Sequence, residues 1–196
     1  PADPRDRLGA EYAFSAFAWQ RGLRCLPRPL AQDTGRRLGL YEFIPGQSLD
    51  AAEIDADRVR EALAFFDDLN RFRDHAEAGG LPPASEACFR LADHLDLIGT
   101  RVRRLSDAGD GPGLQHEAFR LVCDDLVPRW RDVAARVRSR AAAASLPLDR
   151  PLSPADRRLS PSDFGFHNAL RREDGTLCFV DFEYAGWDDP AKFVCD

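Results

Sequence analysis

The 196-residue sequence lacks several features that would place it in a common class of protein. No apolar run approaches the ~20 residues that span a bilayer, and no secretory signal peptide is recognisable. The five cysteines are scattered without a C-x-x-C pair, which argues against a disulfide framework or a zinc site. Methionine is absent, and lysine occurs once, as Lys192. The missing bilayer span, signal peptide and disulfide pattern predict a cytoplasmic protein that has no membrane partner.

The charge balance excludes a further class of partner. The chain has a formal net charge of −6, with 44% hydrophobic and 31% charged residues. Proteins that bind a nucleic acid polymer normally present a basic face, which this balance does not favour. The length suffices to bury a core in one or two domains. The composition is therefore typical of a soluble enzyme domain.

What the sequence does contain is a compact pattern of acids and an amide toward its end. Residues 160–168 read S-P-S-D-F-G-F-H-N, and residues 179–183 read F-V-D-F-E. Asp163, Asn168 and Asp181 follow one another in the order that phosphoryl-transfer enzymes use. In that reaction one carboxylate orients the substrate hydroxyl, while an amide and a second carboxylate hold Mg²⁺ against the nucleotide phosphates.

A hairpin is predicted to bring two of these residues together. Asp174-Gly175 lies between two short apolar runs, which is a strong signal for a two-residue β-turn. In such a turn Asn168 lies directly opposite Asp181, with Cβ atoms about 4.5–5.5 Å apart. An amide and a carboxylate at this spacing suit Mg²⁺, which prefers hard oxygen ligands. The alternative is an ordinary hairpin with polar residues at its rim.

With these motifs the chain resembles the aminoglycoside phosphotransferase and choline kinase family. The family signature is H-x-D-x-x-x-x-N, followed by an Asp on the next strand in the form I-D-[WF]-E-Y-A-G-x-x-D-P. Residues 163–168 and the run V-D-F-E-Y-A-G-W-D-D-P at 180–190 match it closely. The resemblance implies an α+β, protein-kinase-like fold, ATP and Mg²⁺ as cofactors, Asp163 as catalytic base, and Asn168 and Asp181 as metal ligands. The family's supporting His is replaced by Pro161, which puts loop geometry and rate in question more than the reaction class.

The same stretch also spells a competing motif. Asp163-Phe164-Gly165 is the D-F-G of protein kinases, in which the Asp binds Mg²⁺. That register would need a base and an Asn upstream, and residues 143–158 contain acids but no Asn. The register with Asp163 as base needs no missing part, and we prefer it.

Periodicity and turn signals divide the rest of the chain. Helices are expected over 4–22 (with Asp3-Pro4 as cap and first turn, and Gly22 as stop), from Asp55, after Ser85 as cap, and over 114–144 with a bend near Pro128. Leu30-Ala31 and 38–44 are expected as antiparallel strands joined at Asp33-Thr34-Gly35.

The resemblance arranges these elements in two lobes. Residues 1–46 would form a partial N-lobe with a helix, two strands and a hinge, and residues 47–196 a mainly helical C-lobe with the catalytic loop and metal-binding hairpin. Glu11 takes the place of the glutamate that pairs with a phosphate-binding lysine. Glu42, Phe43 and Ile44 take the place of the hinge, where backbone groups meet the adenine. From the residues alone, Glu11 is equally a solvated helix charge and 42–44 an ordinary strand end.

Parts of the family pattern are missing from the chain. The glycine-rich loop and the strand lysine precede the Glu11 helix in the family, and neither G-x-G-x-x-G nor a Walker motif occurs here. We therefore expect an internal fragment of a longer kinase that is weak or inactive alone. The function indicated is transfer of the ATP γ-phosphoryl group to a hydroxyl of an aminoglycoside, a choline-like amine or a sugar.

Two alternatives stay open at this point. Pro161 and the missing lysine motivate a pseudokinase, or a regulatory nucleotide-binding module without turnover. A non-catalytic helical interaction domain with incidental hairpin polarity is the second. The histidines do not decide between them: His75, His94 and His116 show no ligand spacing, and for His167 a structural hydrogen bond is favoured over contact with substrate.

Overall fold

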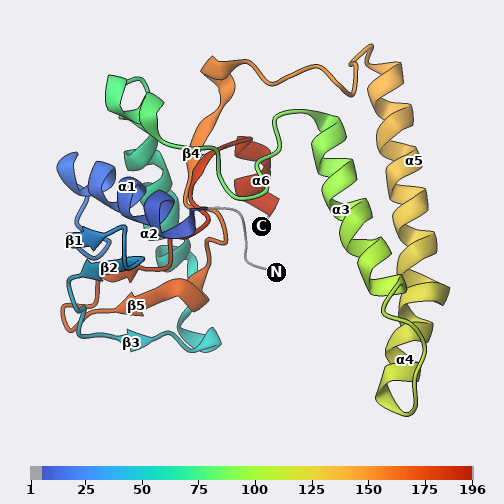
Figure 1. The fold of residues 1–196 in the computed structure, drawn as a ribbon, viewed down its shortest axis with the longest axis horizontal. Helices are drawn as coiled ribbons and strands as arrows, with labels where there is room; N and C mark the ends of the chain where they lie inside the picture. The colour runs from blue at the N-terminus through green and yellow to red at the C-terminus, as the bar shows by residue number, and fades with distance from the viewer. Residues whose placement is uncertain (1–5, 196) are drawn as a thin grey trace. The chain divides into compact units, whose positions relative to one another are not determined.

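The computed structural model describes residues 6–195, which form two compact units (Figure 1). The first combines the segments up to Ala87 and from Ala155 onward, and the second is Cys88–Pro154. The first unit contains α1 (Arg7–Gln20), β1 (Pro29–Asp33), β2 (Leu38–Tyr41), β3 (Gln47–Ser48), α2 (Ala56–Asn70), β4 (Arg158–Ser160), β5 (Ala169–Arg171), β6 (Leu177–Phe179), β7 (Gly186–Asp188) and α6 (Pro190–Cys195). The second contains α3 (Leu91–Ser106), α4 (Leu114–Leu121), a π-helical segment (Val122–Leu126) and α5 (Val127–Ala143). Helices with small antiparallel sheets confirm the predicted α+β class. The boundary expected at residue 46 stays a prediction.

Helix α1 begins at Arg7 because the Asp6 carboxylate accepts a hydrogen bond from the Gly9 amide at 2.9 Å. The predicted cap at Asp3-Pro4 lies outside the described residues. One face of α1 buries Phe14 and Phe17 in the core of the unit. The helix thus fixes the position of Glu11, which lies between these core residues and the helix start.

Strands β1 and β2 pair antiparallel, with Asp33 opposite Leu38, which confirms the predicted strand pair. The last backbone bond of this ribbon runs from the Glu42 amide to the Arg28 carbonyl at 2.8 Å. The expectation that the second strand reaches Ile44 is therefore wrong, because residues 43 and 44 lie beyond the last pairing bond. No helix in residues 6–195 has both the length and the apolar character needed to cross a membrane.

Strands β5 and β6 form the predicted hairpin, but with a three-residue turn. The Gly175 amide donates to the Arg172 carbonyl at 3.0 Å, and the Arg172 amide donates to the Thr176 carbonyl at 2.9 Å. Gly175 has a φ of 84°, the left-handed conformation that closes a type I turn in a three-residue hairpin loop. The Asp174 carboxylate supports the turn by accepting from the Thr176 amide and hydroxyl.

This turn shifts the register by one position relative to the prediction. Ala169 pairs with Phe179, and the Val180 amide donates to the Asn168 carbonyl at 2.9 Å. Asn168 therefore lies opposite Val180, and the prediction that it lies directly opposite Asp181 is wrong. The physical reason is the extra turn residue, since one added residue moves every later partner by one.

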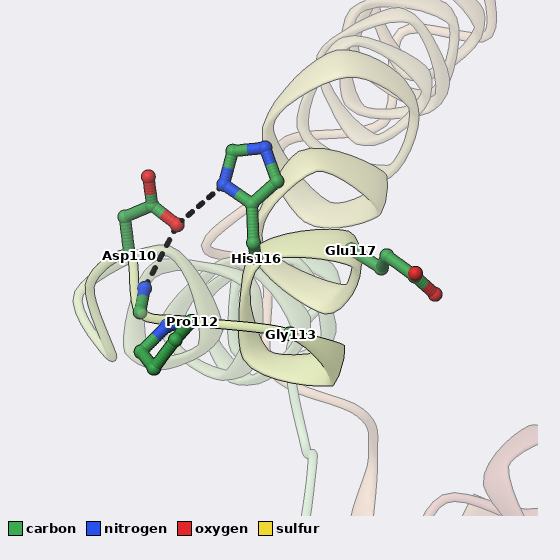
Figure 2. Close-up of a pocket in the computed structure, with 6 residues that line it drawn as sticks. Asp110, Pro112, Gly113, His116 and Glu117 are labelled. Atoms are coloured by element: carbon green, nitrogen blue, oxygen red, sulfur yellow. Dashed lines mark hydrogen bonds and ion pairs between the residues drawn. The ribbon is translucent and has the colours of Figure 1, made fainter.

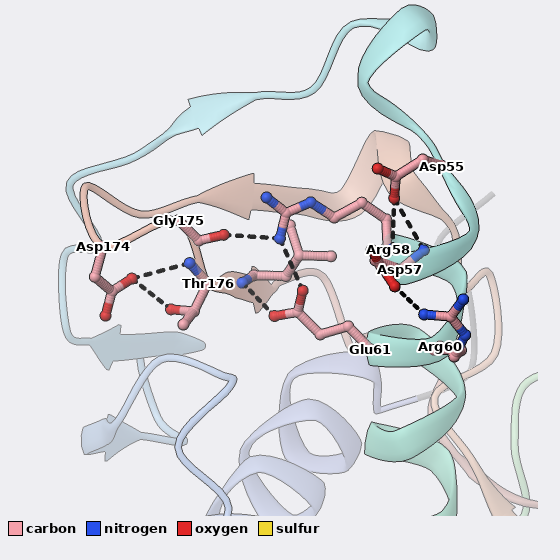
Figure 3. Close-up of polar contacts among 9 residues, drawn as sticks. Asp55, Asp57, Arg58, Arg60, Glu61, Asp174, Gly175 and Thr176 are labelled. Atoms are coloured by element: carbon pink, nitrogen blue, oxygen red, sulfur yellow. Dashed lines mark hydrogen bonds and ion pairs between the residues drawn. The ribbon is translucent and has the colours of Figure 1, made fainter.

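The hairpin is anchored to α2 by two side chains (Figure 3). Arg58 Nη1 donates to the Gly175 carbonyl at 2.7 Å and to Glu61 Oε2 at 2.9 Å. Glu61 Oε1 accepts from the Leu177 amide at 2.6 Å. Asp55 caps α2 by accepting the amides of residues 57 and 58, which confirms the predicted helix start. The turn end of the hairpin is thus held, and its open end carries Asn168.

The far end of α2 holds β4. The Asn70 side chain accepts from the Leu159 amide and donates to the Leu159 carbonyl, both at 2.9 Å. Its Nδ2 also donates to the Phe66 carbonyl at 2.9 Å. The other edge of β4 pairs antiparallel with β7. Strand β4 is therefore paired on both edges directly before the chain enters the loop of Asp163.

A cluster of phenylalanines fills the core between these elements. Phe65 of α2 lies 5.3 Å from Phe179, 5.6 Å from Phe164 and 5.9 Å from Phe182, measured between ring centroids. Phe14 of α1 lies 5.2 Å from Phe182. Aromatic pairs at these distances add to the stabilisation from burial. Phe164 directly follows Asp163, and Phe182 directly follows Asp181. The core therefore anchors both aspartates of the candidate site through the adjacent residues.

The helices of the second unit differ from the predicted boundaries in one place. Helix α3 begins at Leu91, where the Asp93 carboxylate accepts from the amides of Phe89 and Arg90 at 3.0 and 2.8 Å. The prediction that Ser85 caps this helix is wrong, since the Ser85 amide donates to the Tyr184 carbonyl in the first unit. The break expected near Pro128 occurs as the π-helical segment just before it, and Pro128 lies in the first turn of α5.

Candidate active site

Asp163 lies in the loop between β4 and β5 in a rare backbone conformation. Ser162 and Asp163 have φ values of 50° and 31°, which cost energy for residues other than glycine. The Ser162 amide donates to Ser160 Oγ at 3.0 Å, which supports the bend. Pro161 is fully buried. The carboxylate of Asp163 is about half exposed, with 55% of the side chain accessible.

Asn168 and His167 lie on a single 3₁₀ turn, Phe166–Asn168, that reaches back to Asp163. The Asn168 Nδ2 donates to the Asp163 carbonyl at 3.0 Å. His167 Nε2 lies 3.6 Å from Asp163 Oδ1. The structure thus brings the predicted base and the predicted amide ligand together within one loop.

Asp181 lies just beyond β6, with a left-handed φ of 67°. Desolvation raises the pKa of its carboxyl group, and the charges of Glu183 and Asp163 raise it further, while His167 acts in the opposite direction. The contributions of Asp163 and His167 indicate that both lie within electrostatic range of Asp181. Strand β6 ends at Phe179, so the alternation of side chains between the two faces of a strand does not apply to Asp181. The shifted register therefore does not by itself place Asp181 on the opposite side from the loop of Asn168.

Glu11 approaches the same place from α1. Burial raises the pKa of Glu11, and so do the charges of Asp181 and Glu183, while a hydrogen bond from the Phe182 amide lowers it. No arginine or lysine among residues 6–195 forms an ion pair with Glu11; Arg7 on the same helix binds Glu183 instead, at 2.8 Å. The helix predicted to carry the ion-pair glutamate therefore faces the segment of Asp181.

The predicted hinge offers free backbone groups. Phe43 is 86% exposed and Ile44 is 8% exposed. The Glu42 amide is used by Arg28, whereas no backbone hydrogen bond among the described residues engages the amides of Phe43 and Ile44. Free amides at a strand end of this kind can bind a planar base, and the hinge assignment stays a prediction.

The donor set fits a hard divalent cation. Within residues 6–195 no three His, Cys, Asp or Glu side chains are close enough to form a metal cluster by themselves. The amide oxygen of Asn168 and the carboxylate of Asp181 are nevertheless the ligand types that Mg²⁺ prefers, and Mg²⁺ keeps several waters and phosphate oxygens in its shell. The raised pKa of Asp181 beside two other acids means that a cation there would relieve repulsion.

Sequence reasoning missed the residues that hold this site in place. Asn70 binds both backbone groups of Leu159, and Phe65 contacts both Phe164 and Phe182. Neither role is visible locally, because Asn70 and Leu159 are separated by 89 residues. An unusual count of thirteen phenylalanines was the available signal for an aromatic core.

A separate hollow in the second unit contains none of the predicted site residues (Figure 2). It is lined by the loop before α4, where His116 Nδ1 lies 2.8 Å from Asp110 Oδ1. The hydrogen bond from His116 lowers the pKa of Asp110, and both side chains are about half exposed. This contact ties the loop to the first turn of α4, consistent with a structural role for His116.

Comparisons with known protein structures agree with the fold described above. An ethanolamine kinase from Plasmodium vivax superposes with a TM-score of 0.57 at 16% identity, covering 96% of this chain and 49% of that chain. An aminoglycoside phosphotransferase from Alicyclobacillus acidocaldarius gives a TM-score of 0.57 at 13% identity, covering 95% and 56%. The chain thus spans about half the length of these structures, which share its protein-kinase-like fold. No curated protein sequence matches the chain.

The family assignment rests on the sequence profile. The profile of the phosphotransferase enzyme family matches residues 1–192. This range includes the loop of Asp163, the hairpin, Asp181 and the Glu11 helix. The match confirms the family resemblance expected from the motifs. The chain belongs to the phosphotransferase enzyme family.

Proposed function

We propose that the protein transfers the γ-phosphoryl group of ATP to a hydroxyl of a small molecule, with Mg²⁺. The observation that carries the proposal is the convergence of four residues predicted for this chemistry. Asp163 and Asn168 share one loop. The charge of Asp181 raises the pKa of Glu11, and the charge of Asp163 raises the pKa of Asp181. Helix α1 and the distant stretch from Asp163 to Asp181 would thus contribute to a single acidic centre.

The exposed carboxylate of Asp163 supports a role as general base. Its carboxylate is accessible, and it would orient the acceptor hydroxyl and accept its proton as the phosphoryl group is transferred. Asn168 and Asp181 would hold Mg²⁺, which neutralises charge on the nucleotide phosphates. Phe43 and Ile44 would bind the adenine through their free amides, and Glu42 would set their position by its bond to Arg28. Glu11 would orient a cationic group that binds the phosphates.

The acceptor classes that we propose are aminoglycosides, choline-like amines and sugars. The acidic side chains of Glu11 and Asp181 would attract a cationic acceptor by their combined field. The structural neighbours include an ethanolamine kinase and an aminoglycoside phosphotransferase, which is consistent with an amine-bearing acceptor.

The test is an ATP-consumption assay on the full-length protein across a panel of aminoglycosides, amino alcohols and sugars. Asp163→Asn should lower kcat by ~10²–10⁴-fold, the usual contribution of a general base, with nucleotide affinity retained. Asp181→Ala should instead weaken the Mg²⁺-dependent binding of nucleotide, measured by calorimetry. Asp67→Asn, an exposed α2 position, is the matched control and should behave as wild type.

The outcomes separate the alternatives. Mg²⁺-dependent nucleotide binding without turnover on any acceptor would identify a nucleotide-binding module instead of an enzyme. Turnover that is equal in Asp163→Asn and wild type would refute the role of Asp163. Absence of nucleotide binding would leave only a non-catalytic interaction domain.

A further inference from the structure

His167 lies beside the carboxylate of Asp163, and the proposed reaction gives this histidine no role. Its Nε2 lies 3.6 Å from Asp163 Oδ1, and 64% of the His167 side chain is exposed. An exposed pair of this kind stabilises a fold only slightly. Its position beside the base therefore calls for an explanation other than stability.

The loop is built so that the imidazole can occupy this place. A Cβ atom at residue 165 would lie 2.7 Å from His167 Nδ1 and 2.8 Å from its Cε1. Because Gly165 has no side chain, the imidazole ring of His167 can occupy that space. The next residue, Asn168, donates to the Asp163 carbonyl at 3.0 Å. Two successive side chains thus reach back to the same residue, one to its backbone and one to its carboxylate.

The Asp163 carboxylate has little else to orient it. Among residues 6–195 no hydrogen bond to its side-chain oxygens is present, and the imidazole of His167 lies 3.6 Å from Oδ1. Pro161 provides no donor and is buried, and the Ser162 amide is used by Ser160. The left-handed backbone at Asp163 does not by itself fix the direction of its side chain.

We propose that His167 is a positioning residue that holds one oxygen of Asp163, so that the other faces the acceptor hydroxyl. This role rests on the proposed function of Asp163. The distance of 3.6 Å is longer than a hydrogen bond, and contacts of catalytic groups in unliganded sites often shorten when substrate binds. His167 Nε2–H then donates to Oδ1 and fixes the carboxylate.

The kinetic test uses five variants in the full-length protein, one of them a double variant. His167→Ala should lower kcat by about 10–100-fold, as expected for a misplaced catalytic group, with nucleotide affinity unchanged. His167→Gln, whose amide nitrogen reaches a similar place as Nε2, should recover part of the loss. Gly165→Ala should lower kcat with His167 intact, because the added methyl displaces the ring. Adding His167→Ala to Asp163→Asn should cause no further loss, since the two residues act as one unit.

A second measurement does not depend on turnover. The imidazole ¹⁵N resonance of His167, assigned by its disappearance in His167→Ala, should shift in Asp163→Asn and stay in place in Asp67→Asn. An unshifted resonance, an unchanged kcat in His167→Ala, or additive losses in the double variant would each overturn the inference. If the wild type shows no turnover, the proposed function fails and this role with it. Normal wild-type turnover with an unaffected His167→Ala variant overturns the role of His167 alone.

Discussion

Asn70 offers the sharpest test of how the fold holds the loop of Asp163. Its side-chain amide makes three hydrogen bonds, two of them to the fully buried Leu159. Asn70→Ala removes all three and leaves the amide and carbonyl of Leu159 without these partners. A buried polar group left unsatisfied costs about 1–3 kcal/mol, so we expect a loss of about 2–5 kcal/mol in the free energy of unfolding.

A second substitution separates hydrogen bonding from packing. Asn70→Asp keeps the shape and the acceptor for the Leu159 amide, but it replaces the Nδ2 donor with an oxygen. The carbonyls of Leu159 and Phe66 would then face a carboxylate, so Asn70→Asp should be destabilising to a similar degree as Asn70→Ala. If side-chain volume alone mattered, Asn70→Asp would be close to neutral.

Urea unfolding monitored by far-ultraviolet circular dichroism and by tryptophan fluorescence measures both losses. Trp19 and Trp187 report on the unit that contains Asn70, and Trp130 reports on the other unit. The control is Asp67→Ala at an exposed position of the same helix, which should stay within about 0.5 kcal/mol of wild type. An Asn70→Ala variant within that same range, with an unchanged dependence on urea, would refute the reasoning.

Four further results are expected. Phe182→Ala should lower the free energy of unfolding by about 3–5 kcal/mol, because it removes a buried ring that contacts both α1 and α2, and thermal melts will measure it. Gly175→Val should destabilise the hairpin by about 1–2 kcal/mol while Gly175→Asn is milder, since only the valine strongly resists the left-handed φ; equal melting temperatures for the two would contradict the observed turn. Arg58→Ala should loosen the hairpin turn and raise hydrogen exchange at Leu177, with Asp67→Ala as the unaffected control. Desolvation would raise the pKa of Asp93, but hydrogen bonds from the Arg90 side chain and from the amides of Phe89 and Arg90 outweigh it, so the pKa is lowered. The stabilisation by Asp93 is thus present above the ordinary pKa of 3.8 and is lost as the pH falls below it. Asp93→Asn should therefore lower the free energy of unfolding by about 1 kcal/mol at pH 7 but by little at about pH 2–3.

The sequence predicted the local features well because their causes are local. Asp55 caps α2 through amides two and three residues away, and the Asp174-Gly175 pair forces a turn within its own hairpin. The order of Asp163, Asn168 and Asp181 follows from one short stretch of chain, so the kind of chemistry could be inferred from it. These effects act within a few residues, the range over which backbone propensity and side-chain capping operate.

The same local reasoning failed wherever a choice was close. A two-residue and a three-residue turn are both compatible with Asp174-Gly175, and packing against α2 accompanies the longer one, since Arg58 binds the Gly175 carbonyl across 117 positions of the chain. The start of α3 was equally open, and Asp93 caps it while Ser85 is used by Tyr184. In both cases a contact with a distant segment accompanies the observed alternative: Arg58 binds the Gly175 carbonyl, and the Ser85 amide binds the Tyr184 carbonyl.

The sequence alone therefore predicted the candidate base and metal ligands, because residue type and spacing carry that information. Only the tertiary structure decided what surrounds them. It places Glu11 within the field of Asp181, sets His167 beside Asp163, and secures β4 through Asn70. Each of these relations requires the packing of elements around a shared aromatic core, and burial of that core, unlike a turn or a cap, is a property of the whole unit.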